Sequence, residues 1–153
     1  MAIFRRMQRS VRHLPAAALM ASILGFTGCA TLSGPTLEDW QSQELKVVRV
    51  VLNGAWVQVP ADKPITLTLA PDGKVAGRST VNRYFGAFSR TDHGAIVWTG
   101  AMGATRMAGP AEAMKTESEY FQALGKTSEI RVGRDLLIFQ TPDQENIVEL
   151  KRN

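Results

Sequence analysis

The sequence predicts an α+β protein, mainly β, in which a curved antiparallel sheet or open barrel packs against one helix. Short segments of alternating apolar and polar residues recur from residue 45 onward, and turn-forming residues separate them, as in an antiparallel sheet. Only the segment 110–125 has convincing helical spacing. A parallel α/β sheet would need a helix in each crossover connection. The sequence therefore favours the antiparallel class.

The expected strands follow one another along the domain. Residues 47–52 alternate ahead of Asn53-Gly54, a dipeptide that suits the positive φ angles of a tight hairpin turn. Residues 65–69 alternate ahead of the turn Pro71-Asp72-Gly73. The other expected strands are 56–59, 75–78, 82–90, 94–98, 130–132, 136–139 and 147–150.

The helix is expected to run from Pro110, a favoured first residue, to Gly125, a favoured left-handed cap. Three apolar residues and one carboxylate share the stripe that should face the sheet: Met114, Glu117, Phe121 and Leu124. A carboxylate that faces a core is costly unless it is paired and hydrogen-bonded. We therefore expect Glu117 either to pair with Arg83 or Arg106, or to lie in water at the rim of the stripe.

The composition is that of one ordinary folded domain, with 44% hydrophobic and 21% charged residues among 153. The formal net charge is +4, but four arginines precede the first acidic residue, Glu38. Without those four, the 18 basic residues fall to 14 and equal the 14 acidic ones. Nucleic acid is therefore not an expected partner.

Residues 1–28 have the layout of a secretory signal: the arginines come first, and an apolar stretch of 13 residues, 14–26, follows. A membrane-spanning helix would need about 20 apolar residues. The segment Phe26-Thr27-Gly28-Cys29 resembles a bacterial lipobox, with Phe26 in place of the usual leucine. The sequence thus predicts a lipoprotein-type signal peptide and an acylated, palmitate-bearing Cys29. The alternative is an ordinary signal peptide that leaves a free thiol.

Cys29 is the single cysteine of the chain. Its acylation would exclude a disulfide, a thiolate nucleophile and a cysteine-containing metal site from the mature protein. Several acyl chains on one residue would form a stable membrane anchor. Ala30, rather than aspartate, follows the cysteine, and resemblance to lipoprotein sorting in Gram-negative bacteria then favours the outer membrane. Residues 29–44 are expected to form a lipidated tether, within which Trp40 is the first candidate core residue, and residues 45–153 to form the domain.

Three ordered motifs resemble the META/HslJ-like domain, a family of often exported or lipid-anchored proteins. They are the run 75–88, the run 104–110 and Glu117 in the helix. The matching residues are Asn82, Arg83, Tyr84, Gly86, Thr105, Met107, Pro110 and Glu117. The resemblance implies a curved antiparallel sheet or open barrel with one packed helix. It implies no enzymatic activity, and it suggests a role in stress response, envelope integrity or virulence.

The sequence departs from the family at both motif cysteines. Val81 stands at the first of these positions and Gly109 at the second. A redox or disulfide role for that pair is therefore excluded in this chain.

Catalytic and metal-binding groups are sparse in the sequence. His93 is the only histidine outside the signal, and its one adjacent carboxylate, Asp92, completes neither a catalytic triad nor a three-ligand zinc site. We expect no metal and no cofactor. An enzyme would need a pair of carboxylates, and the candidates are Glu117, Glu119 and Asp92.

One constellation remains as a candidate for binding: Asn82, Arg83, Tyr84, Arg106 and Glu117. A guanidinium beside an aromatic ring suits a carboxylate or a glycan. The same residues could instead serve the fold, with Tyr84 packed in the core and Arg83 paired with Glu117.

The sequence as a whole favours a non-catalytic outer-membrane lipoprotein whose domain faces the periplasm. It would act in envelope maintenance or stress response by binding an envelope protein or component that the sequence does not identify. The alternative is a periplasmic inhibitor or a secretin-pilot-like adaptor that presents a groove or an edge strand. A carboxylate-dependent hydrolase of envelope polymers is the least favoured possibility.

Overall fold

The computed structural model describes residues 34–153, so Cys29, the predicted signal and the first part of the tether lie outside the described residues. One 3₁₀ helix, one α-helix and ten strands follow in the order η1 (Glu38–Trp40), β1 (Glu44–Leu52), β2 (Ala55–Trp56), β3 (Thr66–Leu69), β4 (Lys74–Arg78), β5 (Arg83–Arg90), β6 (Ile96–Trp98), β7 (Gly103–Ala104), α1 (Ala111–Lys126), β8 (Glu129–Val132), β9 (Leu137–Gln140) and β10 (Ile147–Arg152). In this part of the chain no helix is both long and apolar enough to cross a membrane.

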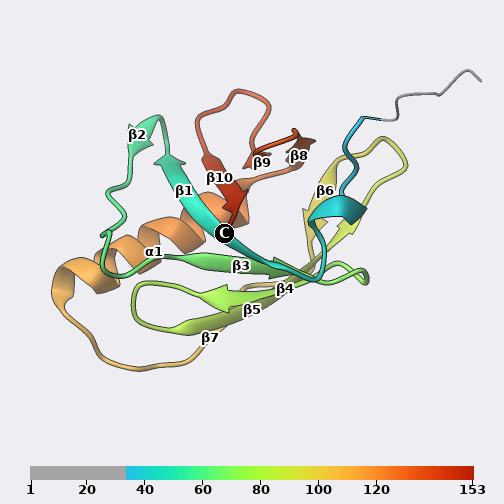
Figure 1. Cartoon of the computed structure of the whole chain (residues 1–153). Coiled ribbons are helices and arrows are strands. Elements are labelled where there is room, and N and C mark those ends of the chain that lie inside the picture. Colours follow the sequence, from blue (N-terminus) through green and yellow to red (C-terminus); the bar gives the residue numbers. More distant parts are fainter. Residues whose placement is uncertain (1–33) are drawn as a thin grey trace, which may run out of the picture. The chain divides into compact units, whose positions relative to one another are not determined.

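The strands form one antiparallel sheet in the order β6-β5-β4-β3-β1-β10-β9-β8, with β2 on β1 and β7 on β5 (Figure 1). At the two outer edges, the backbone N–H of Ile96 donates to the carbonyl oxygen of Ser128 at 2.8 Å. The sheet is therefore nearly a closed barrel. The predicted fold class, mainly β with one packed helix, is confirmed.

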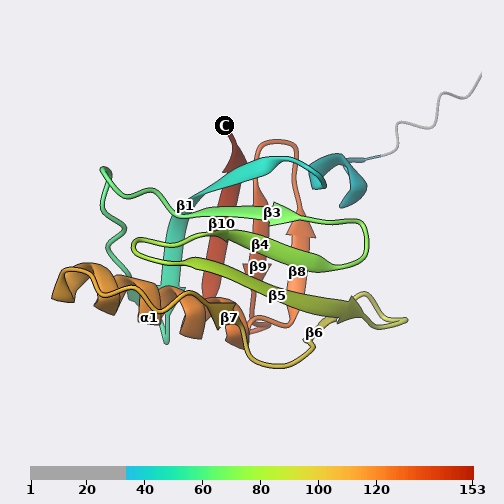
Figure 2. The same ribbon diagram turned by 90° about the horizontal axis from the view of Figure 1, so that it is seen from below.

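Strand β1 connects the two halves of the barrel. Its first residues pair with β3, and its last residues pair with β2. Its pairing with β10 is interrupted by a bulge between Val47 and Arg49, and a bulge bends a strand and increases its twist. Figure 2 shows the result: β10, β9 and β8 run across the direction of β3, β4 and β5.

The core fills the space between these crossed layers and the helix. It contains Trp40, Tyr84, Tyr120 and Phe139 as its largest fully buried side chains. Helix α1 packs against β1, β9 and β10. Phe88, Trp98 and Phe139 form an aromatic cluster, with ring centroids 5.6 to 6.1 Å apart.

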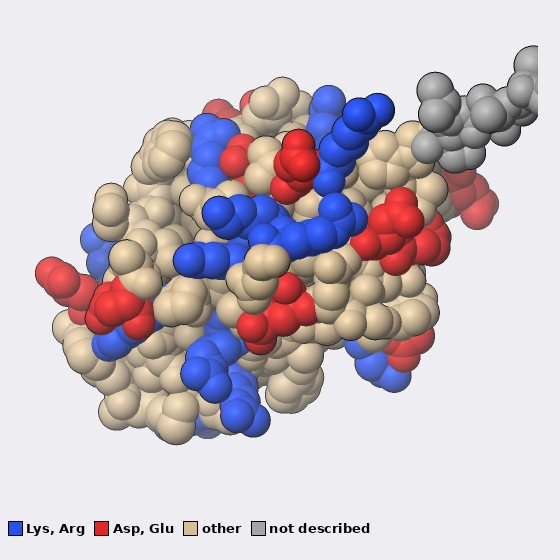
Figure 3. Space-filling model, viewed as in Figure 1, with Lys and Arg blue, Asp and Glu red and all other residues tan. Residues whose placement is uncertain are grey.

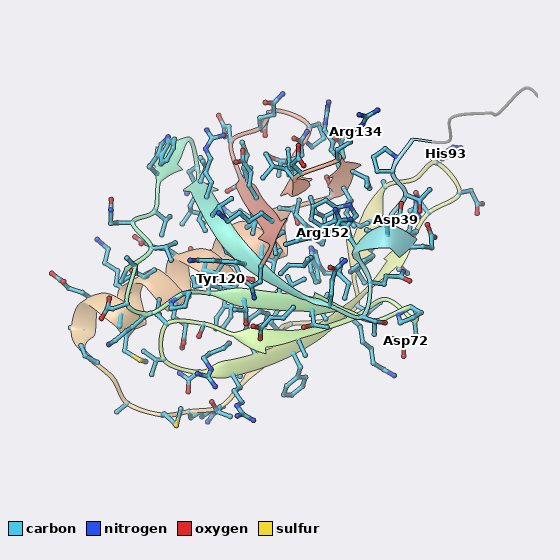
Figure 4. The ribbon with its side chains drawn as sticks, in the orientation of Figure 1. Asp39, Asp72, His93, Tyr120, Arg134 and Arg152 are labelled. Carbon is cyan, nitrogen blue, oxygen red and sulfur yellow. The ribbon has the colours of Figure 1, made fainter. Side chains whose placement is uncertain are left out.

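The packed structure begins at Leu37, ahead of the boundary at residue 45 expected from the sequence. Trp40 has no exposed surface. Arg152 in β10 fixes this segment: its guanidinium lies 4.0 Å from the centre of the Trp40 ring and donates to the carbonyl oxygens of Asp39 and Arg134, each at 3.1 Å. In the view of Figure 4, Arg152 lies below Arg134 and to the left of Asp39.

The predicted helix is confirmed, but its end residues are placed differently. Pro110 is the N-cap rather than the first helical residue, and Gly125 lies inside the helix. The helix ends at Lys126, where the Thr127 backbone N–H and hydroxyl both donate to the carbonyl oxygen of Leu124, at 3.1 and 2.7 Å. Because Thr127 satisfies that carbonyl, the helix needs no left-handed glycine.

The predicted apolar stripe of the helix is displaced by about one residue. Met114 is 36% exposed, and Phe121 is only partly buried. The face that packs on the sheet carries Ala113, Thr116, Glu117, Tyr120, Ala123 and Leu124. Glu117 and Leu124 lie on this face as predicted, but Ala113, Thr116 and Ala123 pack on the sheet where Met114 and Phe121 were expected.

Candidate functional site

The β4–β5 hairpin meets the buried face of α1 at Glu117, which is only 6% exposed. One carboxylate oxygen, Oε2, accepts hydrogen bonds from the Ser79 hydroxyl and from the Asn82 backbone N–H, the latter at 2.8 Å. The other oxygen, Oε1, accepts from Asn82 Nδ2 at 2.7 Å. Glu117 is therefore the buried, hydrogen-bonded glutamate of the first alternative and does not lie in water at the rim, but the expected partners Arg83 and Arg106 are wrong.

These donors decide the ionisation of Glu117. Burial on its own raises the pKa of this carboxyl, but hydrogen bonds from the Ser79 hydroxyl, the Asn82 side chain and the backbone of Asn82 and Val81 outweigh it and hold the pKa below the ordinary 4.5. The carboxylate is thus charged at neutral pH and its charge is satisfied inside the fold. A catalytic acid would need the opposite shift.

Asn82 connects three segments of the chain. Its Nδ2 donates to Glu117 and, at 3.4 Å, to the carbonyl oxygen of Met107. Its Oδ1 accepts from the Thr105 hydroxyl and from the Met107 backbone N–H, both at 2.8 Å. The amide therefore joins the hairpin, the segment that enters the helix and the helix itself. Thr80 adds a second link, because its hydroxyl donates to the Ala113 carbonyl oxygen at 2.6 Å.

Tyr84 is also a core residue. Its hydroxyl donates to the Thr66 carbonyl oxygen at 2.8 Å and lies 2.5 Å from the Tyr120 hydroxyl. Burial, followed by the neighbouring Tyr120, raises the pKa of Tyr84 well above its usual value, and burial raises that of Tyr120. Both phenols are therefore neutral throughout the physiological range.

The two arginines of the constellation lie outside this cluster. Arg83 and Arg106 are both exposed. Arg83 begins β5 directly opposite Arg78, the last residue of β4. Directly opposite residues of an antiparallel pair project from the same face of the sheet, so the hairpin holds two guanidinium groups side by side.

A groove of about 760 Å³ runs along this end of the hairpin. Its cationic lining residues are Lys63, Arg78 and Arg83, its acidic ones are Glu44 and Asp62, and Val81 and Met107 contribute apolar surface. The sequence pointed to Arg83 and Met107 through the family motif, but not to Lys63 or Arg78. Arg78 could have been found from the expected hairpin, because strands 75–78 and 82–90 bring it opposite Arg83.

In the view of Figure 3, basic and acidic side chains are interspersed over the surface, with basic side chains forming a band across the middle.

The remaining candidate residues do not come together. His93 lies on the exposed loop between β5 and β6, away from Tyr120 of the helix (Figure 4). Glu119 lies 3.8 Å from Lys115 on the outer side of the helix, and Asp92 is exposed beside His93. Between residues 34 and 153, no group of three or more histidine, cysteine, aspartate or glutamate side chains is arranged to hold a metal ion.

The structure brings Val81 and Gly109 into contact. A Cβ atom at Gly109 would lie 3.5 Å from Val81 Cβ and 2.8 Å from Val81 Cγ2. These are the positions where the resemblance places the two family cysteines. Val81 therefore fills space that a side chain at position 109 would need, and the two departures from the family motif fit one another.

Together these features define a class of small, nearly closed antiparallel barrels in which a buried glutamate fastens one helix to a β-hairpin. The chain belongs to the META domain family, whose model matches residues 36–153. The resemblance inferred from the motifs is thereby confirmed.

Solved structures support the same fold. An NMR structure of a protein from Burkholderia xenovorans has 23% sequence identity and a TM-score of 0.57, over 76% of this chain and 85% of that one. The crystal structure of a DUF4847 family protein from Bacteroides vulgatus has 12% identity and a TM-score of 0.55, over 77% and 98% of the two chains. At such identities the likeness establishes the fold. No curated protein matches the sequence.

Proposed function

We propose that this protein is an exported lipoprotein, anchored at Cys29 to the outer membrane and facing the periplasm, whose META domain binds an envelope component without catalysing a reaction. The observation that supports the binding role is that the residues of the family motif fall into two groups, one buried and one exposed. Asn82 and Glu117 are buried and hydrogen-bonded to other parts of the protein, whereas Arg83 and Met107 line an open groove. The motif thus stabilises a scaffold and presents a surface.

The absence of convergence among the candidate carboxylates supports the non-catalytic part of the proposal. Glu117 is enclosed by the hairpin, and Glu119 lies on the outer side of the same helix. A glycosidase-type mechanism needs two carboxyl groups on either side of one bond, about 5 to 10 Å apart in a cleft. The groove does contain two other carboxylates, Glu44 and Asp62, but three cations line it with them, and this mixed lining favours binding of a charged group.

The groove is also a better binding surface than a sheet edge. Strand addition, as in the adaptor alternative, requires unpaired backbone at an edge strand. Here the two outer strands of the sheet, β6 and β8, come together at the hydrogen bond between Ile96 and Ser128. Less unpaired backbone is therefore left at the sheet edges for an added strand. We therefore place recognition at the groove.

Site-specific photo-crosslinking in intact cells tests the binding role. A crosslinking residue replaces Met107 in the groove or, as a matched control, Val97 on β6; these side chains are 55% and 53% exposed. The proposal predicts a discrete product with an envelope component from position 107 and none from position 97. Equal products from both positions, or none from either, would contradict it.

The anchor is tested separately by Cys29→Ser. The variant should accumulate as an uncleaved precursor or as soluble protein, because serine offers no thiol for acylation. Intact-protein mass spectrometry and membrane fractionation measure the change. If mass and fractionation match those of the parent protein, Cys29 is not acylated.

A further inference from the structure

The two arginines at the end of the β4–β5 hairpin form an arrangement that the fold maintains against their own repulsion. Arg78 and Arg83 are directly opposite one another in the register of the two strands. Like charges in this position are destabilising. Neither guanidinium forms an ion pair with any residue between 34 and 153. Both side chains are exposed, so their positive charges are directed to the groove and to solvent.

The hairpin that carries these arginines is held rigidly. The turn between them is closed by the Ser79 backbone N–H, which donates to the Asn82 carbonyl oxygen at 2.7 Å, and it is fastened to the helix through Glu117. The backbones of Arg78 and Arg83 are also fixed, because their N–H groups donate to the hydroxyls of Thr66 and Thr105, at 3.3 and 3.2 Å. The backbone positions from which the two cations extend are therefore set before any ligand arrives, so that binding has to order only the two side chains.

The charged residues that line the groove around the arginine pair have a small net positive charge. Lys63, from the loop before β3, adds a third cation, while Asp62 and Glu44 contribute two carboxylates. Asp62 is the sequence neighbour of Lys63, and Glu44 lies opposite Thr68 on β3, where Asn153 Nδ2 donates to it at 3.4 Å. The two acids thus belong to other walls of the groove than the hairpin.

We propose that Arg78 and Arg83 form a binding site for a phosphomonoester group, with Val81 and Met107 contacting the part of the ligand next to the phosphate. A phosphomonoester carries a charge of about −1.5 to −2 at pH 7, which matches two guanidinium groups, whereas one carboxylate would neutralise only one of them. Planar guanidinium groups bind phosphate oxygens in bidentate fashion. This inference rests on the binding role proposed above and names the chemistry of the ligand.

Calorimetric titration of the detergent-solubilised full chain with inorganic phosphate tests the site. Arg78→Gln and Arg83→Gln should each weaken binding by about tenfold, the loss expected for one charge-assisted contact. Arg90→Gln is the matched control. Arg90 is the last residue of β5, at the opposite end of the strand from Arg83, and its replacement changes the net charge by the same amount. Its affinity should stay within about twofold of the parent.

The fold of each variant can be verified by its melting temperature. Arg78→Gln and Arg83→Gln should melt no lower than the parent protein, because each removes a repulsion between like charges. A loss of phosphate binding without a loss of stability therefore reports on the site. Absence of phosphate binding in the parent protein, equal losses in Arg90→Gln, or equal binding of acetate would each overturn the proposal.

Vesicles distinguish a lipid source of the phosphate from a soluble one. Full-length protein is mixed with phosphatidylcholine vesicles that contain or lack phosphatidic acid, with and without competing inorganic phosphate. Arg83-dependent binding to phosphatidic acid that phosphate displaces would support a lipid headgroup, and displaceable phosphate binding without vesicle binding would support a soluble or polymeric phosphate. Crosslinking at position 107 without any phosphate binding would refute this site and leave the binding role standing.

Discussion

Asn82 and Glu117 show how single residues of a surface motif can serve the interior. The motif identified both as members of one constellation, but the expected partner of Glu117 was an arginine. Charge complementarity is what a sequence displays most readily. The actual donors are the Ser79 hydroxyl and the backbone and amide groups of Asn82, and their positions depend on the hairpin turn, which the sequence alone does not fix.

The lowered pKa of Glu117 predicts a pH dependence of stability. Because the folded pKa lies below the unfolded value of 4.5, Glu117 contributes stability that is fully present above pH 4.5 and is lost as the pH falls through the folded pKa. Glu117→Gln removes this titration. The difference in free energy of unfolding between the parent and Glu117→Gln should therefore be constant from pH 7 to about pH 5 and shrink towards pH 3. Urea melts at these pH values measure it, and a difference that is independent of pH would count against a lowered pKa.

Secondary structure elements were predictable to different degrees. Strand alternation placed most of the sheet, because a period of two reports directly on a half-buried strand. The helix was predicted, but its stripe was displaced because Ala113, Thr116 and Ala123 pack closely on the sheet without being strongly apolar. Strand β7 was not among the expected strands. It has only two residues, which pair with β5, and so short a segment shows no alternation from which a strand could be predicted.

The contact between the hairpin turn and the segment before α1 predicts an engineered crosslink. The double variant Val81→Cys with Gly109→Cys should form a disulfide under oxidising conditions, because a Cβ–Cβ distance of 3.5 Å lies within the range for disulfides. The bond should stabilise the fold by about 3 kcal/mol. In a Cys29→Ser background, thiol titration and melts with and without reductant measure both effects.

The single variant Gly109→Ala provides the control for this contact. Its Cβ would lie 2.8 Å from Val81 Cγ2, so it should destabilise the protein by about 1 to 3 kcal/mol, as overpacking does. Free thiols in the oxidised double variant, or a neutral Gly109→Ala, would show that the turn and the helix entry are farther apart than the structure places them.

At the scale of the whole molecule, the domain includes the segment before β1. Trp40→Ala should cost about 3 to 5 kcal/mol, because Trp40 is fully buried. Trp56→Ala is the matched control: Trp56 is 73% exposed, and its replacement should cost less than about 1 kcal/mol. A fragment of residues 34–153 should accordingly be more stable than one of residues 45–153. Urea melts measure the free energies of unfolding. Equal losses for the two tryptophan variants would show that residues 37–43 do not contribute to the stability of the domain.

The central claim about the molecule is that its motif separates into buried residues that hold the fold and exposed residues that face a ligand. The most direct test compares the free energies of unfolding of Glu117→Ala and Arg83→Ala with that of the parent protein in urea at pH 7. Glu117→Ala should cost about 3 kcal/mol or more, because each buried donor left without an acceptor costs about 1 to 3 kcal/mol. Arg83→Ala should change stability by less than about 0.5 kcal/mol. A loss under about 1 kcal/mol for Glu117→Ala, or a large loss for Arg83→Ala, would contradict this division and return Glu117 to the groups available for binding or catalysis.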